Sequence, residues 1–208
     1  MSTGAIYESK YQILHLIGQG QFGRVYCAVD RQTEELVALK ELDRKRFPTR
    51  LFLRELSFLA TLQHPNIVSC RGLEYSPTGR YLVMDYCRGG TLRELMESEN
   101  KPDPLQSLKL ITDILLGLEY AHDHNIVHCD LKPENILLEP QEKGWTARIS
   151  DFGIARLSEE VNPVKISIGD TGSPAYMAPE RFYGRYSHAS DLYAIGVILF
   201  ELLVGERP

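Results

Sequence analysis

Residues 11–42 carry apolar and polar side chains in the two-residue alternation of β-strands, interrupted by a glycine cluster and a turn. Residues 11–30, YQILHLIGQGQFGRVYCAVD, carry a cluster of glycines, RQTEE then supplies turn residues, and LVALKEL follows as a short apolar run. This pattern predicts a β-hairpin and a third strand. After a Pro-Thr-Gly turn, GRYLVMDY over residues 79–86 predicts another strand.

The period then changes to that of helices. Leucines at 53, 56, 59 and 62 predict a helix over residues 50–62, and GGTLRELMESEN begins a largely helical second part. Apolar residues at 105, 108, 111, 115 and 118 predict a long amphipathic helix over 105–124. Residues 192–205, LYAIGVILFELLVG, predict a buried core helix. This run contains Glu201 and is shorter than the roughly 18 residues of a membrane-spanning helix, so no membrane segment is predicted within the chain.

Strands first and helices afterwards indicate an α+β chain in two lobes. Short strands are also predicted on either side of HCDLKPEN and in ARISDFG. Residues 154–179 have weak periodicity and several Ser, Thr, Gly and Pro residues, which predicts a long loop. Loops of that length within a compact domain are usually functional.

Composition narrows the function classes. The 208 residues are 43% hydrophobic and 25% charged, as in soluble globular proteins, and the net charge of −5 argues against a nucleic-acid or membrane-surface binder. The four cysteines, at 27, 70, 87 and 129, lack metal-site spacing, so we expect reduced thiols and a cytoplasmic location. The N-terminal residues have no apolar core of a signal peptide. The sequence predicts no particular oligomeric state.

Three glycines in GQGQFGRV, at 18, 20 and 23, are the first candidates for chemistry. A dinucleotide-binding turn of the same spacing opens a helix, whereas RVYCAVD continues here as a strand. Glycines in a hairpin allow backbone N–H groups to approach phosphate oxygens. The alternative is an ordinary glycine turn.

Charged residues near these strands form the second set. Lys40 ends an apolar strand, from which its amine would reach phosphates if Glu55 held it; the alternative is a solvated surface pair. In HCDLKPEN, Asp130 is a candidate general base and Lys132 a candidate phosphoryl contact. Asn135 and Asp151 offer oxygen ligands of the kind that Mg²⁺ prefers. Each residue taken alone is equally well explained as a solvated loop residue.

Together, GxGxxG-x-V, VALK, HxDLKPEN, DFG and APE occur in this order over residues 11–208. The chain therefore resembles eukaryotic-type (Hanks-type) serine/threonine protein kinases, and GSPAYMAPERF is most similar to bacterial kinases of this type. The resemblance implies a bilobal fold. An N-lobe over 11–87 would hold a small antiparallel sheet with one helix, and a C-lobe over 88–208 would be mostly helical.

The resemblance also implies ATP and Mg²⁺ as cofactors, protein substrates phosphorylated on Ser or Thr, autophosphorylation, and three sets of site residues. The ATP-binding set is Ile17, Gly18, Gly20, Phe22, Gly23, Val25, Ala38, Lys40, Glu55, Met84, Asp85, Cys87 and Leu137. The catalytic residues are Asp130 and Lys132, and the Mg²⁺ ligands are Asn135 and Asp151. Asp191 matches the aspartate that fixes the catalytic loop from the following helix.

The chain departs from the family pattern in two places. Cys129 replaces the arginine that in many kinases binds a phosphorylated residue of the activation loop, so we expect activity that does not depend on phosphorylation of residues 152–177. The sequence also ends where the resemblance implies further C-lobe helices, so we expect a fragment of a longer protein, with Glu180 missing its partner. A pseudokinase or truncated scaffold is the alternative function. A small-molecule phosphotransferase is disfavoured by the APE motif and the long loop.

Overall fold

The structure is a computed structural model that describes residues 10–20, 23–41, 62–75, 80–152, 156–157 and 174–208. The chain divides into two compact units, one comprising residues 1–52 and 70–86 and the other residues 53–69 and 87–208. The predicted helix over 50–62, with Glu55, lies outside the described residues except for Leu62.

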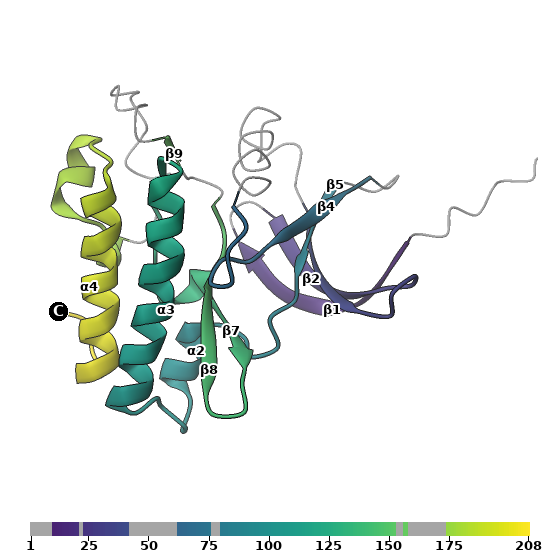
Figure 1. Cartoon of the computed structure of the whole chain (residues 1–208), viewed down its shortest axis with the longest axis horizontal. Coiled ribbons are helices and arrows are strands. Elements are labelled where there is room, and N and C mark those ends of the chain that lie inside the picture. The colour runs from purple at the N-terminus through teal and green to yellow at the C-terminus, as the bar shows by residue number, and fades with distance from the viewer. Residues whose placement is uncertain (1–9, 21–22, 42–61, 76–79, 153–155, 158–173) are drawn as a thin grey trace, which may run out of the picture. The chain divides into compact units, whose positions relative to one another are not determined.

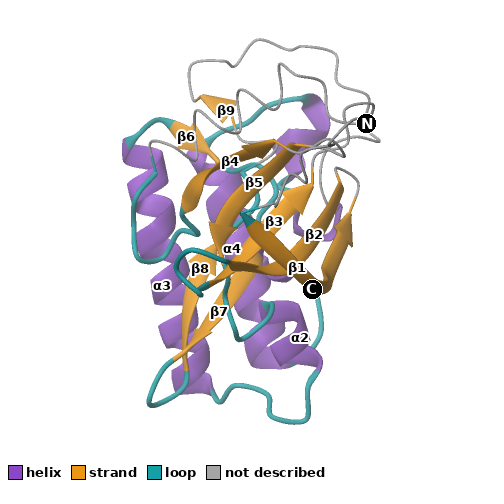
Figure 2. Cartoon of the chain, turned by 90° about the vertical axis from the view of Figure 1, so that its right-hand side faces the viewer, coloured by secondary structure: helices purple, strands orange, loops and turns teal. Residues whose placement is uncertain are grey.

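The first unit contains a five-stranded antiparallel sheet in the order β1-β2-β3-β5-β4 (Figures 1 and 2). Its strands are β1 (Tyr11–Gly20), β2 (Gly23–Asp30), β3 (Leu36–Glu41), β4 (Cys70–Tyr75) and β5 (Arg80–Asp85). The predicted hairpin, third strand and 79–86 strand are therefore confirmed. Gly20 pairs with Gly23, which places the glycine cluster at the hairpin tip as its lack of a following helix indicated.

Strand β4 was not predicted. It lies at an edge of the sheet, exposes Arg71 and Tyr75, and contains Gly72 beside an irregularity in its pairing with β5. A glycine within a strand weakens the alternating pattern that marks strands in a sequence. The strand forms because β5 supplies hydrogen-bonding partners along its length.

The two faces of this sheet have different compositions. Register places Ala28, Val37, Leu39, Tyr81 and Val83 on one face, where they form a buried apolar cluster packed by tyrosines 11 and 26. Residues one step along each strand point to the opposite face. That second face carries the site residues described below.

The described part of the second unit contains three α-helices: α2 (Leu92–Glu97), α3 (Pro104–Asp123) and α4 (His188–Val204). Helix α2 begins at a capping box of Thr91 and Glu94, and α3 begins at a second one of Asp103 and Gln106. Each box satisfies backbone N–H groups that a helix start leaves without partners, and Pro104 suits the first turn of α3. The sequence therefore encodes both starts locally.

The amphipathic helix over 105–124 is confirmed, but most of its expected apolar stripe is on the wrong face. Leu105, Leu108 and Leu115 are exposed, whereas the buried residues are Ser107, Leu110, Ile111, Ile114, Gly117, Leu118 and Ala121. The helix carries apolar residues on both sides, so periodicity alone does not select the buried face. Packing against β8 (Trp145–Ile149) and α4 selects it.

Short elements connect these helices. Strand β6 (Ile126–Val127) pairs with β9 (Arg156–Leu157), and β7 (Ile136–Pro140) pairs with β8, as expected around HCDLKPEN. Three 3-10 segments, η1 (Pro133–Asn135), η2 (Pro174–Tyr176) and η3 (Pro179–Tyr183), complete the described part of the unit. The predicted 154–179 loop contains β9 and η2, and residues 154–155 and 158–173 of it are outside the described residues.

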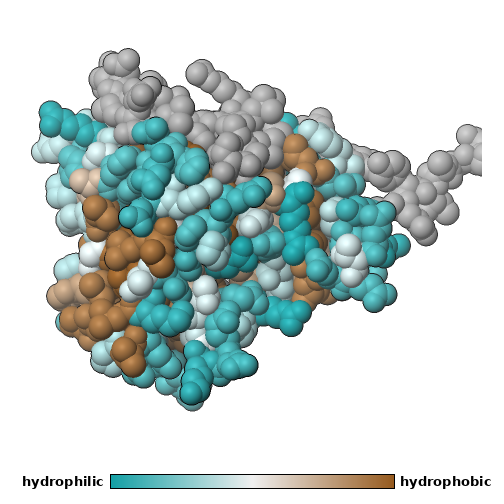
Figure 3. All heavy atoms as spheres, in the orientation of Figure 1, coloured by the Kyte–Doolittle hydropathy of each residue, from teal (hydrophilic) through white to brown (hydrophobic). Residues whose placement is uncertain are grey.

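Helix α4 is buried on one face only, whereas the sequence predicted a buried core helix. Its exposed face carries Leu192, Tyr193, Phe200, Leu203 and Val204, and Figure 3 shows apolar side chains gathered over this helix. Its inner face buries Asp191 and Glu201 among apolar residues. Within the described part of the chain, none of the helices has the length and apolar character needed to cross a bilayer.

Candidate active site

The loop from β6 to β7 brings Asp130, Lys132 and Asn135 together in the second unit. Lys132 Nζ lies 3.0 Å from Asp130 Oδ2, and the Asn135 side-chain amide donates to the same oxygen at 3.1 Å and to the Asp130 carbonyl at 2.8 Å. These contacts fix the direction of the Asp130 carboxylate. They also place a cationic donor and a carboxylate beside each other, as proton acceptance and phosphate binding would require.

His128 supports this loop from beneath. Its ring is fully buried, accepts from the Asp130 backbone N–H at Nδ1 (3.1 Å), and lies 3.0 Å from the Ser150 carbonyl at Nε2. A carbonyl only accepts, so Nε2 carries the proton and the imidazole is the neutral tautomer. The Phe152 ring packs against it edge-on, with the ring centroids 4.7 Å apart. His128 is therefore a structural residue with both nitrogens in use.

Asp191, in the first turn of α4, holds the same loop from the other side. Its Oδ2 accepts from the His128 backbone N–H at 2.8 Å, and its Oδ1 accepts from the Cys129 backbone N–H at 2.9 Å. His122 Nε2 also lies 3.0 Å from Oδ2. The carboxylate is almost completely buried, and these contacts compensate the cost of removing it from water. The geometry matches the structural role that the resemblance implied.

Two residues of the site have left-handed backbone conformations. Cys129 has φ 70° and Asp151 has φ 61°. A residue other than glycine in the left-handed backbone conformation is destabilised by about 1 kcal/mol or more. Such residues are concentrated at functional sites, where contacts with the surrounding structure maintain the conformation. Asp191 provides part of that restraint at Cys129, whose thiol is buried and donates to the Val127 carbonyl.

Hydrogen bonds also connect Asn135 to Ser150, the residue before Asp151. Ser150 donates from its N–H at 2.8 Å and from its hydroxyl at 2.9 Å to the Asn135 carbonyl, which ties the residue before Asp151 to η1. Both contacts with Asp130 use the Asn135 side-chain nitrogen and do not involve its amide oxygen. An amide oxygen and a carboxylate are ligands that suit Mg²⁺.

In the first unit several of the predicted ATP-binding residues share one face of the sheet. Gly18 pairs with Val25, and Val25 pairs with the buried Lys40. Ala38 is two residues before Lys40 and pairs with Met84, so these side chains point to the face opposite the apolar cluster. The sheet therefore presents small and apolar side chains next to one buried amine.

The other predicted site residues that the structure describes lie on several strands of both units or shortly after a strand. Ile17 and Gly20 lie on β1, Gly23 on β2, Asp85 on β5, Cys87 directly after unit one, and Leu137 on β7. Asp85 accepts from Arg71 Nε at 2.8 Å. Phe22 and Glu55 lie outside the described residues, as do Ser158, Ser167, Thr171 and Ser173 of the predicted loop.

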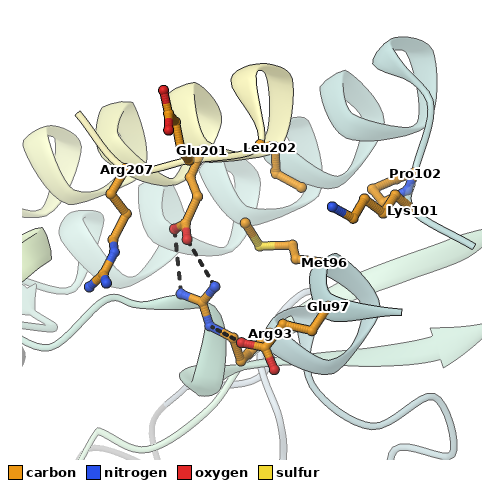
Figure 4. Close-up of a pocket in the computed structure, with 10 residues that line it drawn as sticks. Arg93, Met96, Glu97, Lys101, Pro102, Glu201, Leu202 and Arg207 are labelled. Atoms are coloured by element: carbon orange, nitrogen blue, oxygen red, sulfur yellow. Dashed lines mark hydrogen bonds and ion pairs between the residues drawn. The ribbon is translucent and has the colours of Figure 1, made fainter. Parts of the chain in front are cut away.

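Sequence reasoning missed a buried ionic cluster in the second unit. Arg93 of α2 contacts Glu201 of α4 and the Tyr176 hydroxyl, and Tyr176 donates to Glu201 Oε2 at 2.5 Å. Figure 4 shows Arg93 and Glu201 facing each other. The two residues line a hollow of about 460 Å³ together with Met96 and Leu202. The available signal was Glu201 itself, because a carboxylate within an apolar helical run requires a partner.

Electrostatics in this cluster favour the charged pair. Burial acts to raise the pKa of Glu201, but hydrogen bonds from Arg93 and Tyr176 outweigh it and leave that pKa below its usual value. Burial also acts against the charge of Arg93, yet Glu201 raises its pKa above the ordinary range. The pKa of Tyr176 is raised by burial and by its bond to Glu201, so its phenol stays protonated and donates.

Three features together are typical of the protein kinases. They are a sheet with a buried lysine, a helical unit with the Asp-Lys-Asn loop, and an aspartate on a later helix that binds this loop. Residues 11–208 match the family model described as "Protein kinase domain", and the chain belongs to this family. The resemblance to that family is thereby confirmed, as is the α+β fold with an antiparallel sheet in one part and mainly helices in the other.

Curated relatives agree with this assignment. The chain is 38% identical over 205 residues to human serine/threonine-protein kinase D2, covering 95% of this chain and 23% of that protein. It is 36% identical over 202 residues to the Arabidopsis thaliana serine/threonine-protein kinase RUNKEL, covering 96% of this chain and 14% of the relative. It is 37% identical over 203 residues to serine/threonine-protein kinase 36 of Pongo abelii, covering 96% and 15%. The chain therefore spans less than a quarter of the length of these relatives.

Proposed function

We propose that this chain is the catalytic domain of a serine/threonine protein kinase that transfers the γ-phosphate of ATP to Ser and Thr hydroxyls of proteins, its own included. Family membership and the three relatives named as serine/threonine kinases support the reaction class. The observation that carries the proposal is the convergence of Lys132 and Asn135 on one oxygen of Asp130. In this proposal the kinase domain spans residues 11–208, with lobes over 11–87 and 88–208.

Each residue of the loop has a distinct task in the proposal. Asp130 accepts the proton of the attacking hydroxyl and orients it toward the phosphoryl group. Lys132 offsets negative charge on the transferring group, and its contact with Asp130 keeps both tasks at one place. His128 and Asp191 bind backbone groups of the loop, so the reacting side chains hold their directions before substrate arrives.

ATP and Mg²⁺ are the cofactors that the proposal requires. Lys40 would contact the α- and β-phosphates, and the sheet face that carries Gly18, Val25 and Ala38 would leave room for the nucleotide. Asn135 and Asp151 would hold Mg²⁺, which when bound neutralises phosphate charge. The remaining ATP-binding assignments, including Glu55 and Phe22, rest on the family motifs. The cytoplasm is the location that fits the four free thiols.

The test is phosphate transfer from ATP and Mg²⁺ to a basic protein substrate rich in Ser and Thr, compared among wild type, Asp130→Asn and Asp123→Asn. Asp123 is an exposed aspartate at the end of α3 and serves as the matched control. We expect transfer in wild type and in the control, its loss in Asp130→Asn, and phosphoserine or phosphothreonine in the product. If wild type and the Asp123→Asn control both bind ATP but transfer no phosphate, the pseudokinase alternative is favoured. Phosphotyrosine in the product would contradict the substrate class.

A further inference from the structure

Arg181 buries a guanidinium directly against the backbone of the loop that carries Asp130. Its side chain, on η3, donates from Nη1 to the carbonyl oxygen of Cys129. The residue is only 9% exposed, and Nε and Nη2 have no hydrogen-bond partner among the described residues. Its guanidinium lies 5.0 Å from the centroid of the Tyr186 ring, a stacking contact that favours a delocalised cation.

A permanently charged side chain is rarely buried unless it serves a particular contact. The contact here is with the left-handed residue immediately before Asp130. Asp191 accepts from the N–H of Cys129, and Arg181 donates to its carbonyl, so the polar backbone groups on both sides of this residue are held by charged side chains. The φ of 70° at Cys129 determines the direction in which the chain enters Asp130.

The backbone of Arg181 is itself well anchored. Its N–H donates to the Ala178 carbonyl and its carbonyl accepts from Gly184, each at 3.0 Å, and Ala178 is fully buried. The preceding Glu180 accepts from the Ser190 hydroxyl of α4 at 2.7 Å. A guanidinium projecting from such a fixed segment restrains the carbonyl that it binds.

We propose that Arg181 is a positioning residue of the phosphotransfer reaction, which acts through the Cys129 carbonyl to hold the left-handed turn that directs Asp130. The inference rests on the proposed function, since it assigns Arg181 a part in the same reaction. It adds a contact from η3 to the contact that Asp191 makes from α4. The two charged side chains then act on opposite ends of one residue.

The kinetic test compares Arg181→Met, Arg181→Lys and Arg185→Met. Arg185 is an exposed arginine four residues away and is the matched control. For Arg181→Met we expect kcat to fall by about tenfold to a hundredfold, with the KM for ATP changed by less than about twofold, because misdirecting the base affects the chemical step and not nucleotide binding. Arg181→Lys keeps a charged donor and should recover at least part of the lost kcat, and Arg185→Met should match wild type.

A second readout does not depend on activity. Amide hydrogen exchange of a peptide covering residues 126–135 should be faster in Arg181→Met than in wild type or Arg185→Met, well below the melting temperature. If Arg181→Met does not fold, the shorter and neutral Arg181→Gln takes its place with the same expectations. The proposal would be overturned if Arg181→Met had the kcat and the amide exchange of wild type. It would also be overturned if Arg181→Met lost both kcat and stability and Arg181→Lys restored neither.

The two proposals fail in distinguishable ways. Absence of transfer in wild type removes the proposed function, and the exchange experiment then reports only whether Arg181 restrains the loop. Normal transfer in wild type with an unaffected Arg181→Met variant removes the positioning role alone.

Discussion

Glu201 on α4 and Arg93 on α2 form an ion pair between residues 108 positions apart in the sequence, with Nη1 and Oε1 separated by 2.9 Å. The Glu201 side chain is 8% exposed and that of Arg93 19%, so the pair is largely withdrawn from water. Tyr176, just before the APE motif, completes the cluster through its hydroxyl. The pair therefore connects two helices and the segment that precedes η3 within the second unit.

Breaking this pair from one side should destabilise the second unit strongly. Arg93→Met leaves the Glu201 carboxylate buried with Tyr176 as its remaining partner in the cluster, and we expect a loss of about 3 kcal/mol in the free energy of unfolding. Urea denaturation followed by circular dichroism measures it. The exposed Lys143→Met is the control and should change the free energy by less than about 0.5 kcal/mol.

Adding Glu201→Gln to Arg93→Met removes the uncompensated charge and should restore part of the loss. A cost below about 1 kcal/mol for Arg93→Met would show that the pair behaves as an exposed one. A double variant less stable than Arg93→Met would mean that Glu201 contributes through contacts other than its charge.

The stability of the second unit should fall between neutral and mildly acidic pH because of His188. Its ring stacks on His122 with centroids 4.1 Å apart, and His122 contacts Asp191. Burial, and then the neighbouring His122, lower the pKa of His188, while Asp191 and Asp123 act in the opposite direction more weakly. As pH falls below the ordinary histidine range, the unfolded chain takes up a proton before the folded one, so this contribution is present at higher pH and is lost on acidification.

We therefore expect the free energy of unfolding to fall more in wild type than in His188→Gln between about pH 7.5 and about pH 5.5. The exposed His124→Gln serves as the control and should follow wild type. Equal pH dependence in wild type and His188→Gln would show that His188 does not contribute to it.

Two helical glycines should respond in opposite directions to substitution by alanine. A Cβ at Gly117 of α3 would lie 2.7 Å from the carbonyl oxygen of Asn66, whereas a Cβ at Gly196 of α4 meets nothing within 4 Å. At an interior helix position, alanine is more favourable than glycine by about 1 kcal/mol. We expect Gly196→Ala to gain about 0.5 to 1 kcal/mol and Gly117→Ala to lose about 1 to 3 kcal/mol, because backbone must move to admit the methyl group. Thermal unfolding of both variants provides the comparison, and stabilisation by Gly117→Ala would contradict the close packing.

The fold was predictable where the sequence repeats a local pattern. Alternation predicted the β1–β2 hairpin and β3, and capping residues mark the starts of α2 and α3. Strand β4 and the buried face of α3 were not predicted, since each depends on a partner distant in the sequence: β5 for the strand, and β8 and α4 for the helix.

The same distinction holds within the site. Asp130, Lys132 and Asn135 stand within six residues, so a contiguous motif predicted their convergence, and the structure shows the contacts among them. The contact of Arg181 with Cys129 joins residues 52 positions apart and requires both η3 and a left-handed turn, neither of which leaves a periodic signal in the sequence. Tertiary contacts to backbone atoms are invisible to motif reading for this reason.

Ser158, Ser167 and Thr171 belong to the predicted loop over residues 154–179 and lie outside the described residues. In many kinases an arginine before the catalytic aspartate binds a phosphorylated residue of this loop and orders it. Here that position is Cys129, a residue that is 2% exposed and whose thiol donates to the Val127 carbonyl, so it offers no charge to a phosphate. The polar backbone groups of Cys129 are instead bound by Asp191 and Arg181, which need no phosphate to act.

If the proposed function holds, replacing all three hydroxyl residues with alanine should leave at least about half of the transfer rate, since the loop of Asp130 is already restrained without an ordering phosphate. Initial rates of phosphate transfer to a peptide substrate measure this, with wild type as the upper reference and Asp130→Asn as the background. Collapse of the triple variant to that background, with its melting temperature unchanged, would mean that phosphorylation orders the loop through a cation other than one at position 129.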